Sequence, residues 1–525
     1  MILALLVAPA SAQNNVITVD SDRSAEVVGN STDNGYTRST NSLDNNGNTV
    51  TVSAAVTGNY SVFGTAWLTD GTDVKDNTVT ITGNGSVSGS VSGGRNGFSS
   101  STSSTTLSGN KVIIDTTGSG TVVGYSIYGG RGDGAAALTG NHVTIKQTNT
   151  GHVAGDILGG DGDNGIVSSN TVTIQGSGNV GGKVYGGYAL NNGTVTDNTV
   201  YIGKDENDNG TYSGTITGPV YGGYSYSGNA DSNKVFISSG TVSGDIYGGY
   251  VDIGTGSAIN NTVNISTTGA IYNAIYGGGT YSGTGTTGDL FTGNTLNLKA
   301  DNTVNEVINM NIINFTSSGD AGIGTLDTEV RGGTTGTLVK LNTNDNNVDF
   351  GGDITGNGGI EKIGTGTLTL SGTNNTYSGG TTVSDGTLEV TGTLGTGAGT
   401  GGSNDYAGDI INNSELIFNQ SVGTTQTLSG VISGNGNLTK DGTGTLILSG
   451  ANIYTGLTEV KSGTLELSGS GSISDKLVRI PSTKCVFWQK VIFADEGLEV
   501  NSVFSPLFPN AQINESQDVF RIGEA

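Results

Sequence analysis

The chain has 525 residues, of which 92 are glycine, and its 45 acidic residues against 21 basic ones give a formal net charge of −24. Nucleic acids and anionic membrane surfaces repel such a chain, so we expect neither as a partner. One cysteine and two histidines exclude a disulfide framework and a thiolate metal cluster, and they leave little for a zinc site or imidazole catalysis. We therefore expect no cofactor and no bound metal.

The amino end is typical of an export signal. Residues 1–12 form an apolar run that closes on Ala10-Ser11-Ala12, the small-x-small pattern that signal peptidase cuts after. Gln13 is then the first mature residue. The run is shorter than the roughly 20 apolar residues that span a bilayer. Basic residues do not precede it, so the positive n-region is missing and we expect the true start codon to lie upstream.

An asparagine followed by alternating apolar residues, Asn-x-apolar-x-apolar, recurs at intervals of 28–35 residues. Its copies begin at Asn77, Asn110, Asn141, Asn170, Asn198, Asn233, Asn261 and Asn294. In the fourth copy Val172 and Ile174 fall on one face at the strand period of two, which predicts a half-buried strand. Between copies stands an aromatic or aliphatic residue followed by Gly-Gly, a pair that tolerates the backbone of a tight corner.

Units of this length with two or three short strands cannot enclose a core alone, so each must be covered by the next. The repeats therefore predict an all-β fold, a right-handed parallel β-helix (β-solenoid). Equivalent residues then lie one strand spacing apart, about 4.8 Å. A charge repeated at that spacing repels itself, whereas Thr, Ser and Asn can hydrogen-bond along the stack, which accounts for the low charge content.

A second repeat lies further along the chain. The segment G-N-G-G-I-E-K-I-G-T-G-T-L-T-L-S-G from Gly356 returns from Gly434 as G-N-G-N-L-T-K-D-G-T-G-T-L-I-L-S-G. The copies continue as Y-S-G-G-T-T-V-S-D-G-T-L-E-V from Tyr377 and Y-T-G-L-T-E-V-K-S-G-T-L-E-L from Tyr454. Alternation again predicts strands. The expected inward pairs are Leu368 with Leu370 and Leu388 with Val390.

This second unit resembles the passenger-associated strand repeat of autotransporters, the type V secreted proteins of Gram-negative bacteria. The earlier Y-G-G repeats are similar to those of large adhesin-like passengers. The resemblance implies a parallel β-helix passenger that a C-terminal outer-membrane translocator barrel carries to the cell surface. Strands of about 10 residues build such barrels, and the 55 residues after Ser470 are too few for one. We expect the barrel to be absent from this chain, through a truncated or frameshifted reading frame or a dedicated C-terminal cap.

Five segments follow from these patterns. Residues 1–12 are the signal peptide, 13–76 are N-terminal coils or a cap, and 77–345 are the first repeat solenoid. Residues 346–470 are the passenger-associated strand repeats, and 471–525 are an atypical tail without a barrel.

Arg131-Gly132-Asp133 follows the Gly-Gly corner after Tyr128 and precedes another glycine. We expect this tripeptide on an exposed turn, where an integrin could reach it. The alternative is that a glycine-rich chain with acidic turns contains the tripeptide by chance, and both interpretations remain open.

Tyrosines recur at the Gly-Gly corners, and the expected spacing suits offset contacts between their rings. They either pack on one another along the stack or form an aromatic row suited to sugar stacking. The candidates for this row are Tyr185, Tyr188, Tyr221, Tyr224, Tyr247 and Tyr250.

Two other patterns do not predict a metal site. The segment 159–165 resembles one calcium nonapeptide, but such sites need tandem copies and the equivalent corners lack carboxylates. His142, expected in a strand, and His152, expected in a turn, lack the partners of a zinc set.

The function that these features favour is non-catalytic adhesion by an exported cell-surface or extracellular protein. Its partner would be a host surface protein, a glycan or a second copy of itself, because many shallow repeated contacts combine by avidity. A Gly-Asp-Ser-Gly protease segment is absent from the sequence. The alternative is a β-helix polysaccharide lyase or hydrolase, which would need clustered charged residues in one groove.

Overall fold

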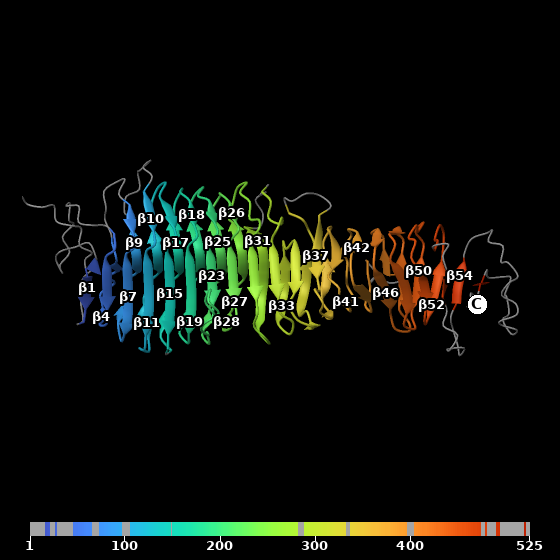
Figure 1. Cartoon of the computed structure of the whole chain (residues 1–525), viewed down its shortest axis with the longest axis horizontal. Coiled ribbons are helices and arrows are strands. Elements are labelled where there is room, and N and C mark those ends of the chain that lie inside the picture. The colour runs from blue at the N-terminus through green and yellow to red at the C-terminus, as the bar shows by residue number, and fades with distance from the viewer. Residues whose placement is uncertain are drawn as a thin grey trace, which may run out of the picture. The chain divides into compact units, whose positions relative to one another are not determined.

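The computed structural model describes residues 16–20, 27–28, 46–65, 73–96, 105–148, 150–281, 288–331, 337–395, 404–473, 478–479, 490–493 and 519–520. The regular elements in these ranges are all β-strands (Figure 1). They belong to two compact units, residues 1–267 with 272–294 (unit 1) and residues 268–271 with 295–525 (unit 2). Among the described residues, none forms a helix with the length and apolarity to cross a membrane. The predicted signal peptide lies outside the described residues.

Unit 1 is a parallel β-helix, as the repeats predict. Its coils place strands on four sheets in turn, which we name A, B, C and D. Successive strands of a sheet come from successive coils and pair in parallel; β15 and β19, for example, align His142 with Thr171 and Val143 with Val172. The sequence predicts two or three strands per coil. The structure has four, because the corner segments also pair as strands of two or three residues in sheets B and D.

The longer strands of unit 1 form sheets A and C. Sheet A contains β1 (Val16–Val19), β3 (Thr49–Val52), β7 (Thr78–Gly83), β11 (Lys111–Thr116), β15 (His142–Gln147), β19 (Thr171–Gly176), β23 (Thr199–Ile202), β27 (Lys234–Ile237) and β30 (Thr262–Ile265). Sheet C contains β2 (Val27–Val28), β5 (Val62–Phe63), β9 (Val91–Arg95), β13 (Ile127–Arg131), β17 (Ile157–Gly162), β21 (Val184–Ala189), β25 (Val220–Ser225), β29 (Ile246–Val251) and β31 (Ile271–Thr280).

The short strands form sheets B and D. Sheet B contains β4 (Ala55–Val56), β8 (Ser86–Val87), β12 (Thr121–Val123), β16 (His152–Val153), β20 (Asn179–Val180), β24 (Thr215–Ile216) and β28 (Thr241–Val242). Sheet D contains β6 (Val74–Lys75), β10 (Thr106–Ser108), β14 (Ala137–Thr139), β18 (Val167–Ser168), β22 (Val195–Thr196) and β26 (Ala230–Asp231). The inward residues of all four sheets form the core, and Val172 and Ile174 of sheet A are fully buried as the alternation predicts.

The repeated asparagines form a continuous hydrogen-bonded ladder inside unit 1. All are buried, and each lies just before a strand, which belongs to sheet A except for β32 (Thr295–Leu298) after Asn294. Asn170 shows the pattern: its Nδ2 donates to Asn198 Oδ1 at 2.9 Å, and its own Oδ1 accepts from Asn141 Nδ2 at 2.9 Å. The ladder members are Asn48, Asn77, Asn110, Asn141, Asn170, Asn198, Asn233, Asn261 and Asn294. The expected hydrogen bonding along the stack is thus confirmed for asparagine.

The Gly-Gly pairs of sheet C are needed because the asparagine ladder packs against them. A Cβ on Gly187 would lie 2.6 Å from Asn198 Nδ2, and one on Gly186 would lie 2.4 Å from the carbonyl oxygen of Gly222 in the next coil. A side chain at either position would therefore displace the ladder or the neighbouring backbone. This close approach links the two sequence elements, the asparagine and the Gly-Gly pair, in each coil.

Unit 2 is also built of stacked parallel strands, on four sheets that we name E, F, G and H. Sheet E contains β32 (Thr295–Leu298), β34 (Ile312–Phe315), β37 (Leu338–Asn342), β40 (Gly359–Ile363), β42 (Thr381–Val383), β45 (Ile410–Asn412) and β48 (Ile432–Ser433). Sheet F contains β33 (Thr303–Ile308), β36 (Ile323–Asp327) and β39 (Asp353–Thr355).

The other two sheets of unit 2 extend to the C-terminal segment. Sheet G contains β35 (Gly319–Asp320), β38 (Val348–Phe350), β41 (Thr367–Leu370), β43 (Thr387–Val390), β46 (Glu415–Asn419), β49 (Asn437–Asp441), β51 (Thr458–Val460) and β53 (Val478–Arg479). Sheet H contains β44 (Asn404–Tyr406), β47 (Thr425–Leu428), β50 (Thr445–Leu448), β52 (Thr464–Leu467), β54 (Lys490–Phe493) and β55 (Val519–Phe520), of which β54 and β55 are antiparallel. The inward pairs expected in β41 and β43 are confirmed, since all four side chains are fully buried. The division into five segments and the right-handed sense stay predictions.

A buried lysine recurs in both copies of the second repeat. The ammonium of Lys362 donates to the carbonyl oxygens of Ile363, Gly364 and Asp385, at 3.2, 2.7 and 3.0 Å. Lys440 makes the equivalent contacts 78 residues later, to the carbonyls of Asp441, Gly442 and Ser462. Burial lowers the pKa of each lysine to about 8, so the ammonium form still prevails at neutral pH. Each lysine therefore ties two successive corners of the stack together.

Candidate binding site

Two columns of side chains run along sheet C, one on each side of the Gly-Gly pairs. In register order, the first column contains Ser92, Tyr128, Leu158, Tyr185, Tyr221, Tyr247 and Tyr276. The second column contains Arg95, Arg131, Asp161, Tyr188, Tyr224, Tyr250 and Gly279. All six tyrosines of the predicted aromatic row belong to these columns.

The tyrosines pack on one another in a herringbone arrangement. Neighbouring rings of one column stack with centroids 4.6–5.1 Å apart and planes within 15° of parallel. Rings of different columns meet edge to face at 5.1–5.8 Å. Both geometries suit the quadrupoles of the rings. The expected packing of the tyrosines on one another is confirmed, whereas their use as a sugar-binding row stays a prediction.

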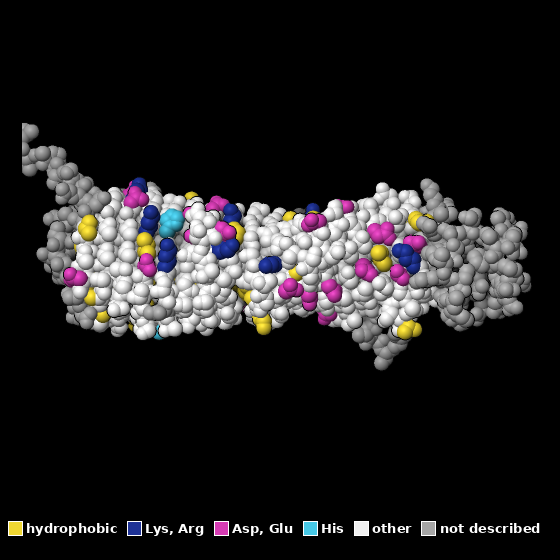
Figure 2. All heavy atoms as spheres, turned by 60° about the horizontal axis from the view of Figure 1, so that its bottom comes forward, with side chains coloured by type: hydrophobic (Ala, Val, Ile, Leu, Met, Phe, Trp, Pro, Cys, Tyr) yellow, Lys and Arg dark blue, Asp and Glu magenta, His cyan; other side chains and the backbone are white. Residues whose placement is uncertain are grey.

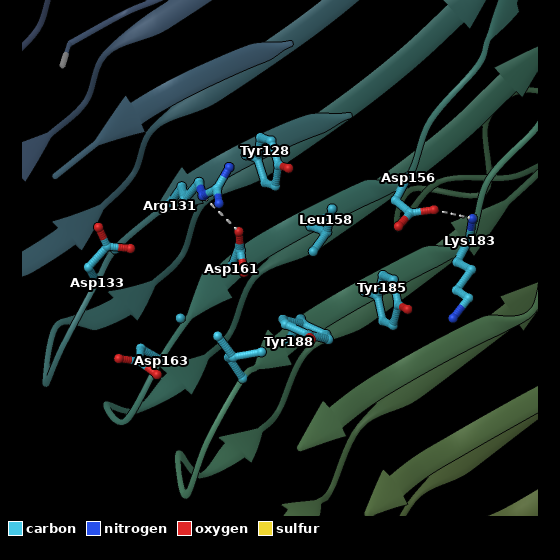
Figure 3. Close-up of a pocket in the computed structure, with 13 residues that line it drawn as sticks. Tyr128, Arg131, Asp133, Asp156, Leu158, Asp161, Asp163, Lys183, Tyr185 and Tyr188 are labelled. Atoms are coloured by element: carbon cyan, nitrogen blue, oxygen red, sulfur yellow. Dashed lines mark hydrogen bonds and ion pairs between the residues drawn. The ribbon is translucent and has the colours of Figure 1, made fainter. Parts of the chain in front are cut away.

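A pocket of about 570 Å³ opens at the N-terminal end of the tyrosines. Leu158 and Asp161 take the register positions before Tyr185 and Tyr188, so the aromatic columns end there. Figure 3 shows the lining residues on three successive strands: Tyr185 and Tyr188 on β21, Leu158 and Asp161 on β17, and Tyr128 and Arg131 on β13. The structure thus brings the tripeptide and the aromatic row, two separate predictions, to one site.

The tripeptide does not form the exposed turn that the sequence predicts. Arg131 ends β13, Gly132 is buried and Asp133 is half-buried. Arg131 Nε lies 3.1 Å from Asp161 Oδ2, and its guanidinium carbon lies 4.8 Å from the centroid of the Tyr128 ring. The expectation was wrong because the chain continues after the Gly-Gly pair as a strand of sheet C. Ligand binding by the three residues stays a prediction.

Asp161 is the most perturbed carboxyl group of the pocket. Burial raises its pKa to about 6, although the charge of Arg131 acts in the opposite direction. The side chain is 15% exposed, whereas that of Arg131 is 36% exposed. At neutral pH the carboxylate is therefore ionised and pairs with the guanidinium, and it gains a proton under mildly acidic conditions.

The other charged groups of the pocket come from the loops beside these strands. Asp156 Oδ1 accepts the backbone N–H of Lys183 at 2.8 Å, which leaves the exposed lysine side chain at the rim. Asp163 accepts a hydrogen bond from the side-chain amide of Asn191. The sequence analysis missed Asp161 as a site residue. Aligning the corners on their Gly-Gly pairs would have placed it between Arg131 and Tyr188.

The described residues hold no group of three or more His, Cys, Asp or Glu side chains arranged for a metal ion. In the segment 159–165, which resembles a calcium nonapeptide, the Asp161 carboxylate forms an ion pair with Arg131. His142 lies in β15 as expected, and burial, followed by the charge of Lys111, lowers its pKa. His152 begins β16 and does not lie in a turn, because this corner segment pairs within sheet B.

Comparison with known protein families identifies the second repeat. Residues 360–390 and 438–467 match the family model of the passenger-associated-transport-repeat. The chain carries autotransporter passenger repeats. The two matched segments include the buried lysines Lys362 and Lys440, so these passenger repeats carry the corner contacts described above.

One relative supports the same resemblance. The chain is 37% identical over 150 residues, 23% of its length, to the adhesin BmaC autotransporter of Brucella suis biovar 1 (strain 1330). It spans 4% of the length of that relative. No solved structure matches the chain. The chain thus resembles an autotransporter passenger of adhesin-like character, and this resemblance indicates secretion to the cell surface or beyond.

Proposed function

We propose that the chain is an exported, non-catalytic β-helix passenger that acts as an adhesin. The single observation that carries the proposal is the open pocket of about 570 Å³ at the end of the tyrosine columns, which aromatic and charged side chains line together. The adhesin name of the similar autotransporter supports it. Delivery would use an outer-membrane translocator, as the passenger resemblance implies. The partner is a host surface protein or glycan, or a second copy of the chain.

The surface of the described residues supports contact by many weak sites. Figure 2 shows a face on which charged and hydrophobic side chains form only small scattered groups. Weak contacts repeated along such a face add up by avidity. A surface of this kind suits attachment better than the tight enclosure of one substrate.

Beads coated with the purified chain test the proposal directly. They should adhere to host cells or immobilised matrix, or should clump with one another, more than beads coated with a non-adhesive protein of equal charge. Equal adhesion and equal clumping of both bead types would contradict an adhesive role.

One observation favours the alternative of a polysaccharide lyase or hydrolase. The pocket holds a carboxyl group with a pKa raised to about 6 beside an arginine, and perturbed groups of this kind occur at catalytic sites. Incubation of the chain with neutral and acidic polysaccharides separates the two functions. New reducing or unsaturated ends that disappear in Asp161→Asn would establish the enzyme and refute the non-catalytic proposal.

A further inference from the structure

The ends of the second tyrosine column differ in a way that suggests a ligand. Within the column, the Tyr224 ring is stacked between Tyr188 and Tyr250, so neighbouring rings cover both of its faces. At the C-terminal end, Gly279 lies so close to Tyr250 that a Cβ on it would be 2.7 Å from the ring carbon Cδ2. At the N-terminal end, the register position next to Tyr188 is Asp161.

Asp161 does not cover the Tyr188 ring as another tyrosine would. Its carboxylate is drawn towards the previous coil by the ion pair with Arg131, 3.1 Å away. Figure 3 shows the carboxylate directed to Arg131, away from Tyr188 on the neighbouring strand. One face of the terminal ring therefore borders the open volume.

The polar groups around this ring can bond to hydroxyls. Asp163 and Lys183 flank the tyrosine pair on opposite sides (Figure 3), and they offer carboxylate acceptors and ammonium donors. Sugar hydroxyls both donate and accept, so they can satisfy both groups. The pocket volume of about 570 Å³ falls within the range of roughly 300–1,000 Å³ that is typical of small-ligand sites.

The charge of the pocket selects among sugars. Its lining includes two cations and four carboxylates: Arg131, Lys183, Asp133, Asp156, Asp161 and Asp163. The excess of carboxylates disfavours sulfated or carboxylated sugars, as does the chain's net charge of −24.

We propose that this pocket binds a neutral pyranose sugar, whose apolar ring face lies on Tyr188 and whose hydroxyls bond to Asp163 and Lys183. The proposal rests on the adhesive function above and names its ligand class. The geometry disfavours recognition of the Arg131-Gly132-Asp133 tripeptide by a protein receptor such as an integrin, because the Arg131 side chain already contacts Asp161 and Tyr128.

Titration calorimetry with the full mature chain tests the proposal, using maltotriose and N-acetylated chitotriose as neutral probes, and sialyllactose and a heparin tetrasaccharide as anionic ones. At least one neutral probe should bind more tightly than both anionic probes. Tyr188→Leu should weaken that binding about tenfold or more, whereas Tyr188→Phe should keep it within about twofold because the ring face remains. Lys183→Gln, a change at an exposed side chain, should weaken it about threefold.

The matched control is Tyr250→Leu, which removes a ring from the covered end of the same column and should leave affinity within about twofold. Thermal unfolding of each variant shows whether it is folded. The proposal is overturned if no neutral probe binds, if an anionic probe binds more tightly, or if folded Tyr188→Leu and Lys183→Gln both bind like the original chain.

The same variants separate this inference from the adhesive function. If beads carrying the chain adhere and beads carrying Tyr188→Leu adhere equally, adhesion stands and the sugar pocket fails as its basis. If the neutral sugar binds through Tyr188 but coated beads neither adhere nor clump, the pocket stands and the adhesive function fails.

Discussion

A residue with positive φ stands immediately before every asparagine of the ladder in unit 1. The nine residues are Gly47, Asp76, Gly109, Gly140, Ser169, Asp197, Ser232, Asn260 and Gly293. Their left-handed backbone turns the chain so that the asparagine side chain points inward and the next strand begins. Glycine, asparagine and aspartate adopt this conformation at low cost, whereas serine is less suited to it.

Serine at such a corner is a site where stability can be gained. Ser169 has φ 55°, and Ser169→Gly should raise the free energy of unfolding by up to about 1 kcal/mol because the strain on Cβ disappears. Urea unfolding measures the change. The neighbouring Ser168→Gly is the control: it lies in the strand β18, so glycine there should lower stability. Destabilisation by both changes to the same extent would show that the corner carries no strain.

The buried carboxyl group of Asp161 should make stability depend on pH. Burial raises the pKa of Asp161 in the folded chain to about 6, from 3.8, so the folded state holds an extra proton between these values. The stabilisation from this group is complete below pH 3.8 and is lost as the pH rises through 6. Relative to Asp161→Asn, the original chain should therefore lose up to about 3 kcal/mol between pH 4 and pH 7.

Urea midpoints of both proteins at several pH values measure this difference, and other titrating groups cancel in the comparison. Carbon-13 NMR of the Asp161 carboxyl gives its pKa independently. Parallel pH profiles of the two proteins would show that the folded carboxyl titrates normally.

At the scale of elements, repetition places the same polar contact in each coil. In the ladder, Asn170 satisfies four partners: it donates to Asn198 Oδ1 and to the carbonyl of Leu138, and it accepts from the backbone N–H and the side-chain amide of Asn141. Because the site is buried, water cannot replace a lost partner, and a missing side chain leaves groups unsatisfied on both neighbouring coils.

Asn170→Ala should therefore destabilise unit 1 by about 3 kcal/mol, since it leaves several buried groups without hydrogen bonds. Asn192→Ala removes an exposed asparagine and should change stability by less than about 0.5 kcal/mol. Hydrogen exchange of amides in β15 and β19 locates the effect. Equal, small changes for both variants would mean that the ladder is not a source of stability.

The buried lysine of the passenger repeats is a second contact of this kind. Lys362→Met keeps the length of the side chain but leaves three carbonyl oxygens without their donor, and it should cost about 2 kcal/mol or more. Lys461→Met, at an exposed ion pair with Glu459, should cost less than about 1 kcal/mol. Thermal unfolding of the two variants provides the comparison. A larger loss in Lys461→Met would contradict a structural role for the buried ammonium.

The sequence predicted the elements better than it predicted the site. Strand positions and inward residues such as Val172 follow from alternation, because burial on one face constrains every second side chain. The short strands of sheets B and D carry too few residues to show a period. The pairing of Arg131 with Asp161 depends on the register between coils of unequal length, which is visible in the sequence only when the Gly-Gly pairs of successive coils are aligned. The exposed-turn prediction failed because Arg131 continues the strand after the Gly-Gly pair.

At the scale of the whole molecule, repulsion among the charges that make up the net charge of −24 lowers the stability of the folded state. Stacked coils bring like charges within the Debye length of about 10 Å at 0.1 M salt, so added salt weakens their repulsion. Raising NaCl from 20 mM to about 500 mM at pH 7.5 should therefore raise the unfolding temperature by a few degrees. At pH 4.2, the isoelectric point, the same salt should have little stabilising effect. Calorimetric scans at both pH values test this, and equal shifts would point to a cause other than charge repulsion.

The asparagine ladder also gives unit 1 a direction. Each ladder side chain between the two ends donates towards the C-terminal neighbour and accepts from the N-terminal one, so the amide dipoles align head to tail. Aligned amides polarise one another, and an inverted coil would oppose donor to donor. New coils gained by gene duplication can therefore join the array in one orientation only, which restricts how such a protein can lengthen during evolution.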